Sequence, residues 1–417
     1  MLKPTTLAMI LAGGRVDELN VLTYYRPKSA LPFGGFGRVI DFALSNLMNS
    51  GIERVAILSQ YRSYSLINHI GTGAAWDMLG RNRGISILPP YIGSDQTNWY
   101  RGSADAVYRN IDFVQYYEPE QILILSGDHI YKMDYQHLIA YHREKDADLT
   151  MGVIRVRPDQ AHRFGIAALD DEDGERGGRV LSYWEKPAQP ESDWASLTVL
   201  CFRPEVMYRL LNENQSDDSF EFGRDIITRL MKAGGRVYAY KFCGYWGYTR
   251  TIEEYWQSNM DLLGPAPLID MEKWGFRTNL DHRGIRDFQP VVIGDDATVH
   301  DSLVYNGCVV DGTVRRSIIF PGVIVEKGAV VEDSVLFFNN HIGRNCRLSK
   351  VVADVNNTFG EGVVVGAEAG RQAEAVTVVG WNNIVPNQVV IGEGATVYPL
   401  LGSGRWKKVI AAGEVLR

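Results

Sequence analysis

Two segments near the N-terminus carry residue types that can hold a phosphate. The first, Leu11-Ala12-Gly13-Gly14-Arg15, closes a short apolar run at residues 7–11. Only glycine lets backbone amides approach a phosphate closely at a sharp strand-to-helix turn. The second is the basic loop Arg26-Pro27-Lys28. Together they predict the front of a nucleotide pocket whose first turn contains the nucleotide-binding residues Leu11, Ala12, Gly13 and Gly14.

A further polar loop, Gly127-Asp128-His129, follows the apolar run at residues 121–126. Mg²⁺ that stays bound to substrate phosphates takes only one or two protein carboxylates, and an aspartate at a strand end suits that role. A turn-capping aspartate is the alternative, and the residue types alone do not separate the two. Ligands bind at the carboxyl ends of parallel strands. We therefore expect Asp128 and the glycine turn to face one pocket.

The segment Glu185-Lys186-Pro187 offers a third charged group. A residue before proline has restricted backbone freedom, and a lysine held there can present a fixed point charge to a sugar phosphate. The alternative is an ordinary solvated lysine. For Lys28, too, an ordinary solvated lysine is the alternative to a phosphate-binding role.

These loops are joined by strands and helices that alternate up to about residue 264. Short apolar strands separated by longer amphipathic segments predict an α/β domain, a Rossmann-like parallel sheet with helices on both faces. The expected strands are residues 7–11, 54–59, 121–126, 149–156 and 236–241. We assign residues 1–264 to this domain.

Residues 265–288 are irregular and contain Pro265, Pro267 and Gly275, which is typical of a linker. From residue 289 to 417, short Val and Ile segments recur every five or six residues, the period of a hexapeptide β-helix. A β-sandwich is the alternative, but its turns recur every 8 to 12 residues. We therefore expect a left-handed parallel β-helix. Its end coils and flank are exposed, which favours an oligomer.

Composition narrows the class of protein. The chain has 417 residues, and its formal charge of -7 argues against non-specific nucleic-acid binding. Its four cysteines form no Cys-x-x-Cys pair, which fits a reducing cytoplasm rather than a zinc site or a disulfide framework. No signal peptide precedes the first strand, and no apolar run is long enough to span a bilayer. We expect a soluble cytoplasmic protein without a nucleic-acid or membrane partner.

The motifs resemble those of the sugar-phosphate nucleotidyltransferases, and most closely the glucose-1-phosphate adenylyltransferase family. The resemblance runs in the family's order through nearly the whole chain. It is carried by the glycine turn, Gly127-Asp128-His129-Ile130-Tyr131, Glu185-Lys186-Pro187, Trp99-Tyr100-Arg101-Gly102 and Phe222-Gly223-Arg224-Asp225. The Trp-Tyr-Arg-Gly segment favours an adenylyl rather than a uridylyl or thymidylyl enzyme.

The resemblance implies that ATP and glucose 1-phosphate give ADP-glucose and diphosphate, with Mg²⁺ as cofactor, for glycogen or α-glucan synthesis. It assigns Asp128 to the metal and Lys28 to the nucleotide phosphates, with Arg15 as a neighbouring cation. It also implies an allosterically regulated tetramer. Further nucleotide-binding residues would be Gln60, Gly102 and Ser103, and the sugar-phosphate site would contain Tyr100, Gly165, Glu185 and Lys186.

Three positions depart from the family pattern. The arginine of the family's Gly-Thr-Arg-Leu turn, which stabilises charge on the ATP phosphates, is Glu18 here. The second magnesium carboxylate, in a Trp-Arg-Asp-Val-Gly-Thr segment, is replaced by Tyr248, and a tyrosine cannot replace a carboxylate on Mg²⁺ at neutral pH. The family's Ser-Met-Gly is Ser196-Leu197-Thr198. Three changes at one centre indicate lost or altered chemistry.

Two functions of different classes remain open from the sequence. The chain performs the adenylyl transfer itself, with weak turnover, or it is a non-catalytic regulatory subunit that modulates a catalytic partner. A nucleotidyltransferase for another sugar phosphate is a more distant alternative. Tyr248 best separates the first two, because a competent enzyme should keep both magnesium carboxylates.

Overall fold

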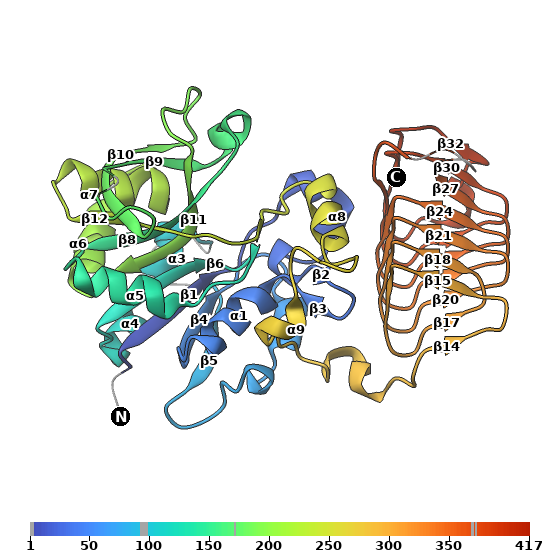
Figure 1. Cartoon of the computed structure of the whole chain (residues 1–417), viewed down its shortest axis with the longest axis horizontal. Coiled ribbons are helices and arrows are strands. Elements are labelled where there is room, and N and C mark those ends of the chain that lie inside the picture. Colours follow the sequence, from blue (N-terminus) through green and yellow to red (C-terminus); the bar gives the residue numbers. More distant parts are fainter. Residues whose placement is uncertain (1–3, 92–98, 171, 368–370, 372) are drawn as a thin grey trace. The chain divides into compact units, whose positions relative to one another are not determined.

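A computed structural model describes the chain except for residues 1–3, 92–98, 171, 368–370 and 372 (Figure 1). It divides into two compact units that interleave along the sequence. The first comprises Met1–Gly14, Phe42–Ser63 and Ile70–Trp246, and the second comprises Arg15–Asp41, Tyr64–His69 and Gly247–Arg417. The domain limits at residues 264 and 289 remain a prediction.

The first unit is built on one nine-stranded sheet. In spatial order its strands are β5 (Gly84–Leu88), β4 (Arg54–Leu58), β1 (Thr6–Leu11), β6 (Gln121–Ser126), β11 (Trp194–Phe202), β8 (Leu149–Arg155), β12 (Val237–Lys241), β10 (Gly177–Glu185) and β9 (Gly165–Leu169). All five expected strands are present, and the α/β class is confirmed.

The sheet is mixed, so the expectation of a wholly parallel sheet is wrong in one half. Strands β5, β4, β1 and β6 are parallel. Strand β11 runs antiparallel to both β6 and β8, and β10 runs antiparallel to β9 and β12. The short connection between β9 and β10 explains part of the difference, since a short connection joins antiparallel strands whereas a parallel pair needs a long crossover.

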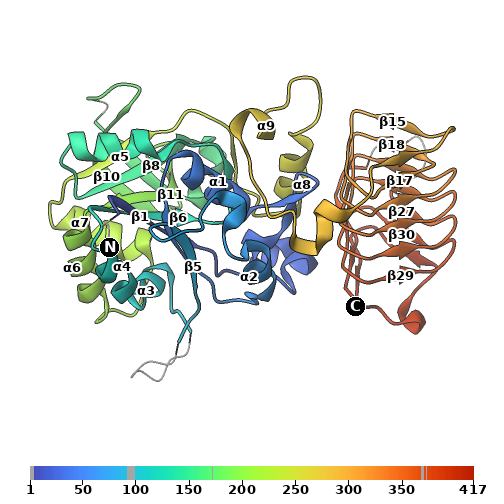
Figure 2. The same ribbon diagram turned by 90° about the horizontal axis from the view of Figure 1, so that it is seen from below.

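Helices cover both faces of this sheet. One face carries α3 (Ser103–Tyr108), α4 (Ile111–Tyr117), α6 (Pro204–Asn214), the helical turn Phe222–Ile227 and α7 (Thr228–Lys232). The other face carries α5 (Tyr135–Glu144), which packs on β8, β11 and β12 (Figure 2). Helix α1 (Ile40–Asn49) and helix α2 (Tyr64–Ile70) each contain residues of both units.

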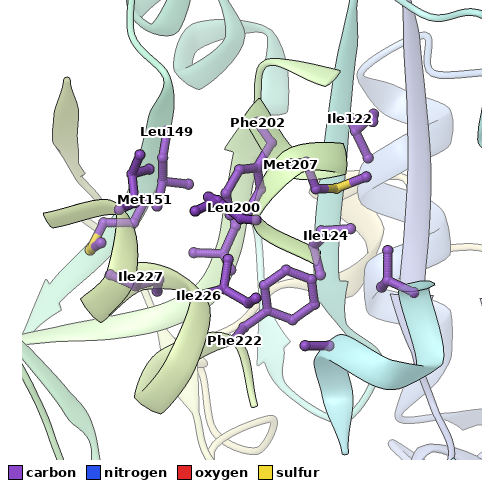
Figure 3. Packing of buried hydrophobic residues seen from close by; sticks show 14 of the residues in the cluster. Ile122, Ile124, Leu149, Met151, Leu200, Phe202, Met207, Phe222, Ile226 and Ile227 are labelled. Atoms are coloured by element: carbon purple, nitrogen blue, oxygen red, sulfur yellow. The ribbon is translucent and has the colours of Figure 1, made fainter. Parts of the chain in front are cut away.

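Alternate residues of the central strands form the main core (Figure 3). Ile122 and Ile124 of β6 lie on the same face as Leu200 and Phe202 of β11, and Met207 of α6 packs over them. All five side chains are buried. Successive strand residues point to opposite faces, which is why every second residue enters this cluster.

The second unit contains the predicted left-handed β-helix, whose coils form three parallel sheets. The first sheet holds β14 (Val292–Ile293), β17 (Val309–Val310), β20 (Ile324–Val325), β23 (His341–Ile342), β26 (Thr358–Phe359) and β29 (Ile384–Val385). The second holds β15 (Thr298–His300), β18 (Thr313–Arg315), β21 (Val330–Glu332), β24 (Arg347–Ser349), β27 (Val364–Gly366), β30 (Val390–Gly392) and β32 (Val409–Ile410). The third holds β16 (Leu303–Val304), β19 (Ile318–Ile319), β22 (Val335–Leu336), β25 (Val351–Ala353), β28 (Thr377–Val379), β31 (Thr396–Val397) and β33 (Val415–Leu416).

The third sheet of the β-helix is covered by other segments of the same unit. Helix α8 (Ile252–Met260) places the ring of Tyr255 at 6.3 Å from that of Phe337, and Trp256 Nε1 donates to the carbonyl of Asp333 at 2.6 Å. The hairpin β2 (Pro32–Phe33) and β3 (Gly37–Arg38) and helix α9 (Met271–Trp274) also belong to this unit. None of the described helices is long and apolar enough to cross a membrane.

Candidate functional site

In the first unit, the glycine turn and the Asp128 loop lie at the same edge of the sheet. The register pairs Leu11 with Ser126, so both parallel strands end side by side. Gly127 N donates to Leu11 O at 3.0 Å, which links the two loops. The register therefore places both loops at one edge of the sheet, and their facing one pocket stays a prediction.

The two glycines of the turn differ in what surrounds them. A Cβ on Gly13 would lie 3.1 Å from Gln60 N, and Tyr61 N donates to Gly13 O at 3.2 Å, so packing against the next loop requires a small residue there. A Cβ on Gly14 would meet nothing within 4 Å. Ala12 N donates to Leu58 O at 2.9 Å. Local packing thus accounts for Gly13 and leaves Gly14 exposed at the loop surface.

Asp128 is held at the end of β6 by its neighbours. Ser126 Oγ donates to Asp128 Oδ1, and His129 Nε2 lies 3.5 Å from the same oxygen. The Asp128 side chain is 29% exposed, whereas that of His129 is buried. The ring of His129 packs edge-on against Trp246 at 5.5 Å. Asp128 therefore presents one partly exposed carboxylate in a rigid setting.

The expected nucleotide residues Gln60, Gly102 and Ser103 are engaged in internal contacts. Gln60 Oε1 accepts a hydrogen bond from Tyr100 N. A Cβ on Gly102 would lie 2.2 Å from Phe220 O, so the close approach of this chain segment requires glycine. Ser103 Oγ donates to Glu221 Oε2 at 2.5 Å and accepts from Phe222 N at 3.0 Å. These contacts position the loop.

Tyr100 is fixed in the same way. Its hydroxyl donates to Leu88 O at 3.2 Å and accepts from Asn110 Nδ2 at 2.9 Å. Burial raises the pKa of Tyr100, so the phenol stays neutral near pH 7. The side chain expected in the sugar-phosphate site thus has its hydroxyl engaged within the protein.

The expected sugar-phosphate residues Gly165, Glu185 and Lys186 do come together in the first unit. Tyr183 Oη donates to Glu185 Oε2 at 2.8 Å, and a Cβ on Gly165 would lie 3.0 Å from that oxygen. Lys186 N donates to Phe164 O at 3.0 Å, and φ of Lys186 is +49°. Its ammonium lies 3.9 Å from Glu185 Oε1, and the side chain is 54% exposed. The backbone of Lys186 is therefore fixed while its charge faces solvent.

The Ser196-Leu197-Thr198 departure lies in an irregularity of β11. The register with β8 shifts between Ser196 and Leu200, and Thr198 has φ of +53°. L-residues with a β-branched side chain rarely adopt this conformation, whereas glycine does so readily. The glycine of the family pattern fits this backbone better than the threonine present here.

In the second unit, Glu18 and Tyr248 are brought together by Arg250. Arg250 Nε donates to Glu18 Oε1 at 2.9 Å, and Arg250 Nη1 donates to Tyr248 Oη at 3.3 Å. The hydrogen bond to Tyr248, followed by that to Glu18, raises the pKa of Arg250. Two of the departures thus belong to one hydrogen-bonded group. Sequence analysis missed Arg250, although it stands where the family segment Trp-Arg-Asp-Val-Gly-Thr has its glycine.

Lys28 and Arg15 also belong to the second unit. The ammonium of Lys28 is buried, donates to Tyr248 O at 2.6 Å and lies 5.1 Å from the centre of the Tyr248 ring. Arg15 Nε lies 2.9 Å from Asp17 Oδ1, and both side chains are exposed. Lys28 is therefore part of the Arg250 group, whereas the contact of Arg15 is a local surface pair.

A buried cationic cluster lies elsewhere in the second unit and was not predicted. Arg26 Nη2 donates to both carboxylate oxygens of Asp354, at 2.6 and 2.7 Å. Burial, then the charge of Arg283, lowers the pKa of Arg38 to about 9. Burial, then the charge of Arg38, lowers the pKa of His282 to about 3. The residues of this cluster lie far apart in sequence, so no local motif indicates that they meet.

Of the two carboxylates that the resemblance implies for Mg²⁺, Asp128 is present and position 248 is a tyrosine. Among the residues that the structure describes, no group of three or more His, Cys, Asp or Glu side chains could hold a metal ion. Asp128 offers one carboxylate beside Ser126 and His129. Tyr248, at the second expected position, contributes a phenol bonded to a guanidinium.

Comparison with known proteins agrees with both halves of the chain. The family model described as nucleotidyl transferase matches residues 7–264, and the one described as GlmU-like, C-terminal hexapeptide, matches residues 291–385.

Three curated relatives align along nearly the whole chain, and all are named glucose-1-phosphate adenylyltransferase. The protein of Desulfitobacterium hafniense (strain Y51) is 39% identical over 95% of this chain and 99% of its own length. That of Desulforamulus reducens is 40% identical over 93% and 96%, respectively. That of Acetivibrio thermocellus is 36% identical over 99% and 100%.

Proposed function

Because the chain belongs to the glucose-1-phosphate adenylyltransferase family, we propose that it is a subunit of this type that binds ATP and glucose 1-phosphate and turns them over slowly. In the reaction, a phosphate oxygen of glucose 1-phosphate attacks the α-phosphorus of ATP. That P–O bond forms while the bond to the β-phosphate oxygen breaks, which gives ADP-glucose and diphosphate. Catalysis of such a transfer rests on positioning and on charge stabilisation.

The observation that carries slow turnover is the contact between Glu18, Arg250 and Tyr248. A carboxylate stands where an arginine should stabilise the phosphates, and a phenol stands where a metal carboxylate is expected. Loss of one preorganised transition-state contact commonly costs about 100- to 1000-fold in rate. The same observation favours a second candidate function, a non-catalytic regulatory subunit that modulates a catalytic partner.

Asp128 would take Mg²⁺ in this proposal, and when bound the metal neutralises phosphate charge. The resemblance assigns nucleotide binding to Leu11, Ala12, Gly13, Gly14, Gln60, Gly102 and Ser103, and it assigns contacts with the phosphates to Lys28 and Arg15. Glucose 1-phosphate would lie near Tyr100, Gly165, Glu185 and Lys186. The product would serve glycogen or α-glucan synthesis. The free cysteines, three buried and Cys243 exposed, support a reducing cytoplasmic setting.

Allosteric regulation, which the family resemblance implies, is a further part of the proposal.

Replacing Lys186 by alanine is expected to weaken glucose 1-phosphate binding about 10- to 100-fold, since a hydrogen bond to a charged group is worth about 1.5–3 kcal/mol. The exposed ammonium on a fixed backbone motivates this expectation. Calorimetric titration of wild type and Lys186→Ala measures the change. Lys232→Ala, at the end of α7, is the matched control and should bind as wild type. Equal affinity of all three proteins would remove Lys186 from the site.

We also propose a homo- or hetero-tetramer assembled through the β-helix. Ile293 and Val299 occupy interior positions of the first coil, yet they are 50% and 39% exposed, whereas Val310 and Val314 in the next coil are buried. Apolar interior residues at an open solenoid end favour burial against another subunit. Light scattering should find a tetramer for wild type and smaller species for Ile293→Glu. A wild-type monomer at micromolar concentration would contradict this assembly.

A further inference from the structure

Arg250 is held in place from two directions. Its backbone N donates to Glu254 Oε2 at 2.9 Å, at the N-terminus of α8, where Thr251 and Glu254 form a capping box. Its side chain contacts Glu18 and Tyr248 as described above. Within the described part of the chain, Nη2 of Arg250 makes no hydrogen bond, and the side chain is 39% exposed. The guanidinium therefore keeps donors that a ligand can use.

We propose that Arg250 is the cation that binds the ATP phosphates in this chain, and that it makes ATP binding independent of Mg²⁺. The inference rests on the proposed function and deepens it. Arg250 donates hydrogen bonds to Glu18 and Tyr248. The resemblance implies that these two positions act on the ATP phosphates and their metal. In this chain a guanidinium joins those two positions, and the carboxylate at position 18 is paired with that guanidinium.

Charge and geometry favour this replacement. A guanidinium offers a planar set of donors that matches phosphate oxygens and stays charged at all physiological pH values. The buried ammonium of Lys28 lies beside the same tyrosine, with its hydrogen bond to Tyr248 O. Two fixed cations beside Tyr248 thus supply positive charge for a triphosphate.

Glu18 competes with the ligand for Arg250. The Glu18 carboxylate accepts a hydrogen bond from Nε of the guanidinium, and the Glu18 side chain is 46% exposed. An exposed ion pair of this kind is worth at most about 1 kcal/mol, so a triphosphate can displace it. Removing the charge of Glu18 should therefore tighten ATP binding by up to about fivefold.

The test is calorimetric titration of the full-length chain with ATP, once in EDTA and once in excess Mg²⁺. Wild type should bind with affinities within about threefold of each other in the two buffers. Arg250→Gln should weaken binding in EDTA by about 10- to 100-fold, and Glu18→Gln should tighten it. Arg344→Gln is the matched control, because Arg344 is an exposed arginine paired with Glu326 on the β-helix. All these side chains are at least partly exposed, and thermal melts verify that the variants fold.

The possible results separate the inference about Arg250 from the proposed function. ATP binding that requires Mg²⁺, or that survives Arg250→Gln unchanged, overturns the inference and leaves the proposed function standing. Absence of ATP binding in both buffers contradicts the proposed function and the inference with it. Metal-independent binding that is lost with Arg250→Gln, and retained with Arg344→Gln, supports both.

Discussion

Replacing Glu18 by arginine, Tyr248 by aspartate and Arg250 by glycine together is expected to raise ADP-glucose formation at least about 100-fold. The first two changes restore groups that act mainly in the transition state, which raises kcat. The third is required by the structure. An arginine at position 18 would otherwise face the guanidinium that now pairs with Glu18, and like charges there would repel.

The measurement is the rate of diphosphate release at saturating ATP, glucose 1-phosphate and Mg²⁺. Glu18→Arg alone should gain little, because Arg250 remains opposite it. Adding Asp128→Asn to the triple variant should abolish the gain, since Asp128 is the remaining carboxylate expected to hold the metal. The single changes should not sum to the triple effect, because they act on the same phosphate charge. A triple variant that binds ATP but is no faster than wild type would show that other groups limit the reaction.

Replacing Asp354 by alanine is expected to destabilise the second unit by about 3–5 kcal/mol, because it leaves the charge of Arg26 buried without its partner. The pair is nearly inaccessible, with side chains 8% and 1% exposed, and Arg26 donates to both carboxylate oxygens. Burial, followed by the charge of Arg283 and then that of Arg26, already lowers the pKa of Arg38. Loss of Asp354 therefore removes a compensating negative charge from a cationic cluster.

Denaturant midpoints of the full chain measure this effect. Asp296→Ala is the matched control, because the Asp296 pair with Lys327 on the β-helix is 75% exposed on both sides and its loss should leave the midpoint nearly unchanged. Asp354→Asn should lie between the two, since the amide oxygen still accepts a hydrogen bond. Equal midpoints for Asp354→Ala and Asp296→Ala would show that the buried pair contributes no more than a surface pair.

The sequence predicted the elements that are governed by local periodicity. The expected strands at residues 7–11, 121–126 and 149–156 each lie within one or two residues of the observed bounds, because a buried strand is a continuous apolar run. The β-helix was equally predictable, since every coil repeats the same short pattern. Strand β11 was missed as an antiparallel partner of β6 and β8, because strand direction depends on long-range pairing.

The loops of the candidate site were predicted from the sequence, but the pairing of its charged side chains was not. The register places the Gly13 turn and Asp128 at one edge, as the strand ends had indicated. From the sequence, Glu18 was interpreted only as the loss of an arginine that stabilises the phosphates. The structure instead pairs it with Arg250, which is 232 residues away in the chain. No local sequence pattern indicates a contact between residues so far apart. Arg250 could therefore be identified as the partner of Glu18 only from the folded structure.

The most direct test of the account is diphosphate release by the purified wild-type chain alone, measured together with ATP and glucose 1-phosphate binding. We predict that both substrates bind and that release is slower than a typical enzymatic rate of about 1 per second by a factor of about 100 or more. Turnover at about 1 per second or faster would contradict it, because Glu18, Tyr248 and Arg250 would then form a competent catalytic centre.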